Sequence, residues 1–256
     1  MFSTTEITSA EITSDNPVHQ RLFFAYVEAA KMIKGNLLEV GCGVGRGLSV
    51  LLNACEHYTA IDKNEQLIEA LQQHHSAHTF IAMNIPPFKN IQENTFDFLV
   101  SFQVIEHIQN DALFVEEIHR VLKPGGKAII TTPNIHLSLT RNPWHIREYT
   151  AEALFKLLDN YFPTIDMHGV AGNEKVITYY EENKKAVAKL KKLDIFNLEK
   201  HLPRKLLQIP YDILNRRNRK KLMNQENSLA NDITHQDYYL SDQPSKSLDL
   251  FYIATK

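Results

Sequence analysis

A glycine-rich turn with a downstream acid is the part of the sequence whose residue types suggest chemistry most clearly. Four glycines occupy alternate positions directly after the expected strand at 36–40: Gly41, Gly43, Gly45 and Gly47. Glycine admits positive φ and lets the backbone approach a ligand closely. Asp62 follows 21 residues after Gly41, at the end of the next expected strand, where a carboxylate can accept hydrogen bonds from ribose hydroxyls. The pattern predicts a site for a cofactor that contains a nucleoside.

Two classes of cofactor are bound by turns of this kind. A dinucleotide fingerprint reads G-x-G-x-x-G/A. Counted from Gly41, its sixth position is occupied here by Arg46, so that fingerprint is not matched. The alternative without chemistry is a glycine turn that only joins a strand to a helix, and the further motifs along the chain disfavour it.

The order E-x-G-x-G-x-G at residues 39–45 resembles motif I of the class I S-adenosylmethionine-dependent methyltransferases, of the type 11 and quinone O-methyltransferase-like kind. Asp62 looks like the acid that binds the ribose in that family, with Lys63 beside the adenine. Residues 96–107 are similar to the family's fourth strand and the turn after it, and residues 122–126, LKPGG, precede the next strand. The match covers residues 37–170 and the final strand.

The resemblance implies S-adenosylmethionine as the cofactor and names its contacts. At Asn84 the family usually carries an Asp against the adenine amino group, and the amide keeps a polar side chain there. The implied cofactor-binding residues are Glu39, Gly41, Cys42, Gly43, Gly45, Asp62, Lys63, Asn84, Ile85, Phe102 and Gln103.

Two polar clusters follow the fourth and fifth expected strands and carry the candidates for catalysis. Methyl transfer from a sulfonium depends mainly on alignment, and a base contributes typically ~10²–10⁴ when the acceptor is a hydroxyl. His107 and His145 are the candidate bases, because imidazole titrates near neutrality, and Glu106 stands beside His107; a polar pair that caps a helix is the plain alternative. Three residues of the second cluster are expected to contact the substrate: Trp144, Arg147 and Tyr149.

A metal-dependent version of the site is an alternative. Small-RNA 2′-O-methyltransferases of the same superfamily carry Glu-x-x-Glu-His and a later His, which bind a divalent ion. Here Gln103 replaces the first carboxylate ahead of Glu106 and His107, and the loss of a carboxylate weakens a site for a hard cation. We therefore predict no metal ligand.

Short apolar runs alternate with helical patterns along the chain, which predicts βαβ units and a mainly parallel sheet. Strands are expected at 36–40, 58–61, 79–83, 96–102, 127–132, 164–170 and 247–255. The resemblance implies an α/β, Rossmann-like seven-stranded sheet with an antiparallel last strand. We expect residues 1–34 to form an N-terminal segment and helix, residues 35–170 with 247–256 to form the methyltransferase domain that the resemblance implies, and residues 171–246 to form a basic helical cap inserted before the final strand.

Composition and charge narrow the partners without naming one. The 256 residues are 43% hydrophobic, which excludes a disordered class, and two cysteines exclude a disulfide framework and fit a cytoplasmic chain. The net charge of −2 hides 14 Lys and Arg against 6 Asp and Glu in residues 174–223. The run 216–221 has no aromatic residue, which disfavours nucleic acid as the partner of the cap.

We expect O-methylation of a small-molecule, glycan or lipid-linked acceptor, with an anionic partner at the cap. The alternatives are metal-dependent RNA 2′-O-methylation or a non-catalytic cofactor-binding protein. No apolar run is long enough to span a membrane.

Overall fold

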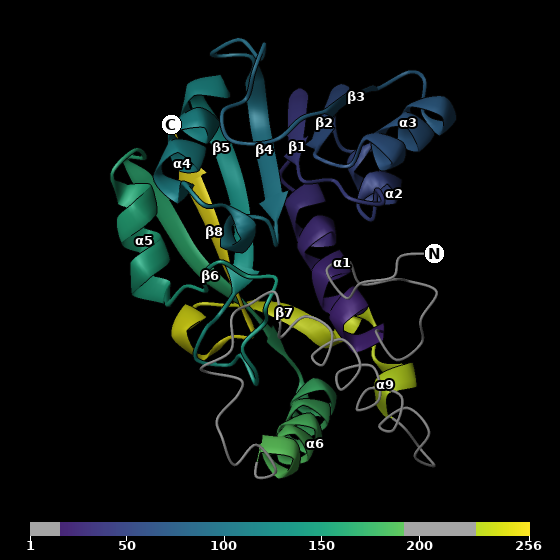
Figure 1. The fold of residues 1–256 in the computed structure, drawn as a ribbon, viewed down its shortest axis with the longest axis vertical. Coiled ribbons are helices and arrows are strands. Elements are labelled where there is room, and N and C mark those ends of the chain that lie inside the picture. Colours follow the sequence, from purple (N-terminus) through teal and green to yellow (C-terminus); the bar gives the residue numbers. More distant parts are fainter. Residues whose placement is uncertain (1–15, 192–228) are drawn as a thin grey trace.

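The computed structural model describes residues 16–191 and 229–256, which build one mixed eight-stranded sheet (Figure 1). The strand order is β3-β2-β1-β4-β5-β8-β6-β7. The strands are β1 (Asn36–Val40), β2 (His57–Asp62), β3 (Thr79–Ala82), β4 (Phe96–Phe102), β5 (Leu122–Pro133), β6 (Thr164–Gly172), β7 (Tyr238–Ser241) and β8 (Asp249–Thr255). Pairing is parallel from β3 through β5, whereas β8 is antiparallel to both β5 and β6.

Helices lie on both faces of the sheet, as alternation along buried strands requires. They are α1 (Asn16–Ala30), α2 (Leu48–Leu51), α3 (Glu65–His74), α4 (Asp111–Val121), α5 (Ala151–Asp159), α6 (Glu174–Lys191) and α9 (Leu229–Asp232). In β1, Leu37 packs into one core with residues of α1 and α2, and Leu38 into the other with residues of α4 and α5. The 3₁₀ turns are Ile105–His107, His235–Asp237 and Pro244–Lys246.

Local capping explains why several helices begin where they do. The side chains of Asn64, Asn110 and Thr150 each accept a backbone N–H at the start of α3, α4 and α5. Such caps are worth about 1 kcal/mol each. The caps therefore fix the residue at which each of these helices begins. The loops that lead into them follow the carboxyl ends of parallel strands, and these loops lie at one edge of the sheet.

The α/β Rossmann-like class and the antiparallel last strand are confirmed, but the sheet has eight strands where seven were expected. The additional strand is β7, which pairs antiparallel with β6 inside the segment expected to be a helical cap. Its sequence, YYLS, favours a strand, but it is only 4 residues long and follows a polar stretch that hides the signal. Helix α2 after the glycine turn is a single short turn that ends at Leu51.

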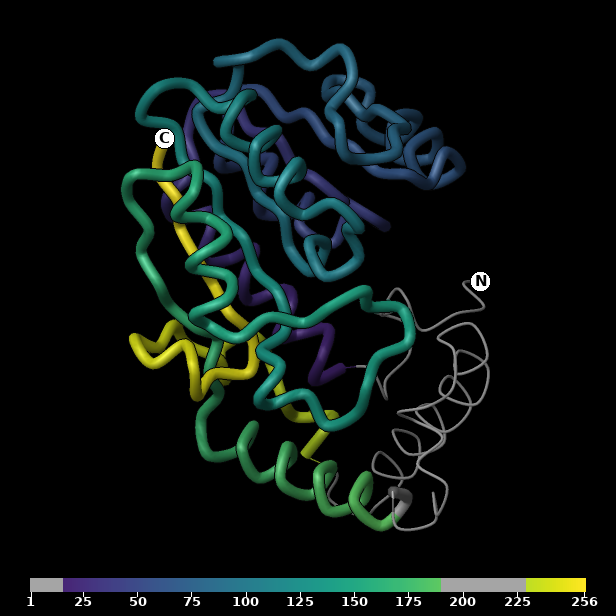
Figure 2. The backbone as a smooth tube through the Cα atoms, turned by 60° about the vertical axis from the view of Figure 1, so that its left-hand side comes forward, coloured from purple at the N-terminus to yellow at the C-terminus, as the bar shows by residue number. Residues whose placement is uncertain are grey.

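The proposed domain boundaries stay a prediction. Figure 2 shows α6 extending away from the sheet after β6. Residues 192–228 of the proposed cap, including the basic run 216–221, lie outside the described residues, as do residues 1–15 of the N-terminal segment. The connection between β5 and α5, residues 134–150, leaves the sheet at the end opposite the C terminus (Figure 2).

Candidate active site

The glycine turn joins β1 to α2 and leaves one position open. Gly41 donates its N–H to the carbonyl of Ile61 at 2.7 Å, and its φ is +80°. A Cβ atom on Gly41 would lie 2.4 Å from Val104 Cγ2, whereas a Cβ atom on Gly43 would meet nothing within 4 Å. Gly41 is thus required by packing, and Gly43, with φ +52°, borders empty space in which backbone and ligand can approach each other.

The Asp62 carboxylate is aimed at this turn. Oδ2 accepts the backbone N–H of Gly43 at 2.9 Å, and Oδ1 accepts that of Asn64, also at 2.9 Å. Each oxygen of a carboxylate has lone pairs for more than one donor. Asp62 is therefore held at the mouth of the turn with acceptor capacity left for a ligand's hydroxyl groups.

Glu39 lies behind the turn. Its side chain accepts hydrogen bonds from Tyr26 Oη at 2.8 Å and from Tyr58 Oη, and the residue is 2% exposed. Burial raises the pKa of Glu39, and the two tyrosine hydroxyls oppose that shift. A Cβ atom on Gly47 would lie 2.1 Å from Tyr26 Cδ1, so α1 packs directly on the turn. These contacts make Glu39 a residue that positions the turn, and a direct cofactor contact stays a prediction.

The other predicted cofactor residues divide into buried and accessible ones. The Cys42 side chain is buried, and burial raises the pKa of its thiol. Lys63 and Asn84 are exposed and Ile85 is half-buried. A pocket of about 370 Å³ lies beside the end of β3, lined by Ile81, Ala82, Met83, Asn84, Lys89 and Asn90. Asn84 therefore borders an accessible hollow, and its contact with adenine stays a prediction.

Phe102 ends β4, and Gln103 follows it beside the turn. The Phe102 ring packs edge-on against Tyr26, with ring centroids 4.7 Å apart. Gln103 has φ +58°, an uncommon conformation for a non-glycine residue, and is held by its N–H to the Thr131 carbonyl at 2.9 Å. Its side chain donates to Thr131 Oγ1 at 3.4 Å. Strain of this kind clusters at functional sites.

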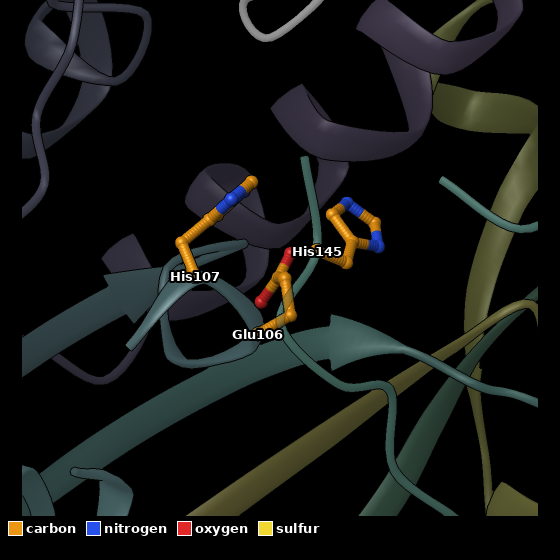
Figure 3. Close-up of side chains that lie close together, drawn as sticks. All are labelled: Glu106, His107 and His145. Atoms are coloured by element: carbon orange, nitrogen blue, oxygen red, sulfur yellow. The ribbon is translucent and has the colours of Figure 1, made fainter. Parts of the chain in front are cut away.

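Glu106, His107 and His145 come together where the connections after β4 and β5 meet (Figure 3). One potential ligand atom from each side chain lies within 4.8 Å of those from the other two. The two imidazole rings are edge to face, with centroids 5.0 Å apart. The Ile146 N–H donates to the Glu106 carbonyl at 2.7 Å, which holds the second loop onto the first.

Hydrogen bonds fix the tautomers of both histidines. His107 Nδ1 lies 3.0 Å from the Trp144 carbonyl, which can only accept, so Nδ1 carries the hydrogen and the lone pair is on Nε2. His145 Nδ1 faces Glu148 at 2.7 Å. Asn142 Oδ1 accepts the Trp144 N–H, so its Nδ2 donates to His145 Nε2 at 2.7 Å. The lone pair of His107 is therefore on Nε2, and the lone pair of His145, also on Nε2, accepts from Asn142.

The Glu106 side chain is fully buried in this cluster. Oε2 accepts from Thr132 Oγ1 at 2.9 Å, and Oε1 has no hydrogen-bond partner. Burial raises the pKa of Glu106 to about 7, opposed mainly by the charge of His145. A carboxyl group with this pKa can exchange a proton near neutral pH.

Arg147 and Tyr149 are directed away from the cluster. Tyr149 is 4% exposed and donates to Asp111 Oδ2 at 2.7 Å. Arg147 forms an ion pair with the same carboxylate and donates to the Gln109 carbonyl at 2.9 Å. Both side chains therefore hold the loop 134–150 against Asp111 and Gln109. Contact of either residue with a substrate stays a prediction. Trp144 is half-buried, and its Nε1 has no hydrogen-bond partner.

Comparisons with known proteins agree with this geometry. Residues 38–130 match a family model described as a methyltransferase domain. A probable S-adenosylmethionine-dependent methyltransferase of Mycolicibacterium smegmatis is 32% identical over 162 residues, which are 61% of this chain and 63% of that protein.

The chain contains a class I methyltransferase domain. S-adenosylmethionine is the cofactor of this class. A ubiquinone biosynthesis O-methyltransferase of Dictyostelium discoideum is 29% identical to this chain over 144 residues, which are 48% of this chain and 40% of that protein. A solved Thermotoga maritima structure, described as a possible histamine N-methyltransferase, shares the fold with a TM-score of 0.57 and 14% identity, covering 93% of this chain and 91% of that one. The chain spans about three fifths of the length of the mycobacterial relative and less of the ubiquinone-pathway one.

Sequence reasoning missed several residues that shape the methyltransferase domain's site. Tyr26 and Tyr58 bind Glu39, and Arg21 pairs with the buried Asp249. The one signal available was an acidic residue at position 249 in an otherwise apolar strand, SLDLFYIAT. Among the helices of the described residues, none has both the length and the apolar character to cross a membrane.

Proposed function

We propose that the chain transfers the methyl group of S-adenosylmethionine to a hydroxyl of a small-molecule, glycan or lipid-linked acceptor. The observation that carries this proposal is the open position at Gly43 facing Asp62, at the same edge of the sheet as the cluster of Glu106 and His107. The ligands of open α/β sheets bind at this edge. The Dictyostelium relative is named as an O-methyltransferase, which supports a hydroxyl acceptor.

When bound, S-adenosylmethionine supplies an electrophilic methyl group on a sulfonium. The amide of Gly43 and the carboxylate of Asp62 would bind and orient it, and Asn84 would lie on its adenine side. His107 is the base, because its Nδ1 hydrogen is held by the Trp144 carbonyl and its lone pair lies on Nε2. Glu106 beside it stabilises the imidazolium that forms when His107 takes the proton. His145, held by Glu148, lies beside Glu106 and packs edge-on against the His107 ring.

Formation of S-adenosylhomocysteine tests this function. The protein is incubated with labelled S-adenosylmethionine and, separately, with phenolic small molecules, glycans and lipid extracts, and the product is quantified by mass spectrometry. His107→Ala should reduce turnover about 10²–10⁴-fold while cofactor affinity stays near that of the parent. His136→Ala, an exposed histidine, is the matched control. Equal turnover in His107→Ala would remove His107 as the base, and no transfer to any acceptor class would contradict the function.

A metal-dependent variant of the reaction is the second candidate, and the donor set of the cluster favours it. Two imidazoles and one carboxylate suit a borderline divalent ion, and each has an outer partner: the Trp144 carbonyl, Glu148 and Thr132. Such partners orient ligands in metal sites. The residues would hold a divalent ion once the Asn142 amide leaves His145 Nε2, and the ion would act as a Lewis acid on the acceptor hydroxyl. Gln103, whose side chain binds Thr131, is not part of the set.

Chelation separates the two candidates. If His107 acts as the base without a metal, the protein should keep full turnover after dialysis against EDTA. If the reaction depends on a metal, turnover should be lost and then restored by Mn²⁺ or Zn²⁺. RNA as the acceptor has no support from the described residues, and the basic run 216–221 lies outside them. A non-catalytic role would be indicated by cofactor binding without any product.

A further inference from the structure

The loop between β5 and α5 packs along the connection from β4 to α4, next to the proposed base. The backbone N–H groups of Ile146 and Arg147 both donate to the Glu106 carbonyl, at 2.7 Å and 3.3 Å. In the other direction, Nδ1 of His107 donates to the Trp144 carbonyl at 3.0 Å. The loop therefore holds both the ring of His107 and the peptide group that precedes it.

Asp111, the first residue of α4, fastens the end of this loop. Its Oδ2 atom accepts a hydrogen bond from Tyr149 Oη at 2.7 Å and forms an ion pair with Arg147. The Arg147 guanidinium also donates to the Gln109 carbonyl at 2.9 Å, and its Nη1 atom, the partner of Asp111, is buried. One carboxylate oxygen thus joins two residues of the loop to the start of α4.

Several other polar contacts of the loop join its own residues to each other. His145 Nδ1 lies 2.7 Å from Glu148 Oε1, and Asn142 Oδ1 accepts the Trp144 N–H at 3.0 Å. Such contacts preserve the internal shape of the loop, but they do not fix its distance from the proposed base. The contacts of Asp111 do, because they connect the loop to the same stretch of chain that carries the base.

The position of the loop decides where the proton of the neutral His107 ring lies. The tautomer of an imidazole is set by the hydrogen bond that one of its nitrogens makes, and here the Trp144 carbonyl accepts from Nδ1. Without Asp111, the buried end of the Arg147 guanidinium would lose its ion-pair partner, which is costly and favours loop positions in which the guanidinium reaches water. The Trp144 carbonyl would then leave Nδ1, and the ring would exchange between its two tautomers.

We propose that Asp111 is a positioning residue, which holds His107 as its Nδ1–H tautomer by fixing the loop that carries the Trp144 carbonyl. This inference rests on the proposed function, because the tautomer matters to the reaction only where His107 is the base. The plain alternative is that Asp111 serves α4 alone, as an acid in the first turn of the helix that interacts favourably with the helix dipole. That role would leave the His107 ring unaffected.

NMR of the protein labelled with ¹⁵N-histidine tests the assignment without any acceptor. Spectra are recorded with EDTA at about pH 8.5, where an ordinary imidazole is neutral, and the His107 signals are assigned from their loss in His107→Gln. We expect the parent to show the Nδ1–H tautomer alone. Asp111→Ala and Arg147→Met should each show a mixture of tautomers, and the double variant should change no more than either single one, because the two residues form one pair. Glu116→Ala, an exposed acid on the same helix, should keep the parent spectrum.

Hydrogen exchange of the Ile146 amide gives a second measurement, because that N–H binds the Glu106 carbonyl. Its protection should fall about 10- to 100-fold in Asp111→Ala and in Arg147→Met. Glu116→Ala should keep the protection of the parent.

A His107 ring that stays Nδ1–H in Arg147→Met, or a parent ring that is not Nδ1–H alone, would overturn the inference. Effects of Asp111→Ala that Arg147→Met does not reproduce would assign Asp111 to α4 alone and overturn it as well. Failure of the proposed function is seen separately, as equal turnover in His107→Ala, and does not alter the tautomer that the spectra report.

Discussion

The carboxylate of Asp62 accepts the backbone N–H of Gly43 at 2.9 Å, so the acid at the end of β2 and the open position of the glycine turn form one unit. Neither residue needs to move far to meet a ligand, because the second carboxylate oxygen is fixed by the Asn64 N–H. Such preorganisation lowers the entropy that binding must overcome.

Replacing Asp62 by Ala should weaken binding of S-adenosylhomocysteine by about tenfold or more, because a charged acceptor contributes about 1.5–3 kcal/mol. Isothermal calorimetry measures the change. Asp159→Asn, at an exposed position in α5, serves as the control and should bind like the parent. Unchanged affinity in Asp62→Ala would show that the ligand does not use this carboxylate.

Replacing Gly43 and Gly47 by alanine should have different effects on stability and on cofactor affinity. In Gly43→Ala the new methyl group enters open space, so stability should fall by only about 1–2 kcal/mol for the left-handed backbone while cofactor affinity is lost. In Gly47→Ala the methyl group collides with the Tyr26 ring, and overpacking should cost about 1–3 kcal/mol. Thermal unfolding measures the stability of both variants, and calorimetry measures their affinity for S-adenosylhomocysteine. An affinity in Gly43→Ala equal to that of the parent would show that the cofactor does not approach the Gly43 backbone.

Tyr58→Phe should destabilise the protein by about 1–3 kcal/mol, because it removes a hydroxyl donor from the buried Glu39 carboxylate. Urea unfolding at pH 7 without cofactor measures the effect. Tyr239→Phe removes the same atom from a side chain that is exposed on β7 and should change stability by no more than about 0.5 kcal/mol. Similar stabilities for the two variants would show that the hydrogen bond from Tyr58 to Glu39 does not stabilise the fold.

The wild-type protein should lose stability relative to Glu106→Gln as pH rises. The folded pKa of Glu106 is raised to about 7 by burial, from an ordinary 4.5, so ionising it costs nothing below about pH 4.5 and up to about 3 kcal/mol above pH 7. Urea unfolding between pH 5 and pH 8 in the presence of a chelator measures the difference. A difference that does not change with pH would show that Glu106 titrates normally.

Local patterns in the sequence were sufficient for the layered fold and the cofactor turn. The alternating glycines at 41–47 and the acid at 62 carry their signal within one βαβ unit, and the apolar runs at 36–40 and 96–102 coincide with β1 and β4. These features depend on neighbours along the chain. Periodicity and turn residues are therefore enough to find them.

The missed features depend on residues that are distant in sequence. Arg21 and Asp249 stand at opposite ends of the chain and meet only when α1 packs across the start of β8. The direction of Tyr149 toward Asp111 likewise follows from how the loop after β5 folds onto α4. Residue types predicted a polar loop there, but only tertiary packing decides which of its side chains face the cluster.

Calorimetry with S-adenosylmethionine and, in parallel, with NAD is the most direct test of the central claim that the turn at 41–47 and Asp62 bind an adenosyl amino acid. We predict one-to-one binding of S-adenosylmethionine that is lost in Gly43→Ala, and no comparable heat with NAD. Tighter binding of NAD, or no binding of S-adenosylmethionine by the folded parent protein, would contradict the account.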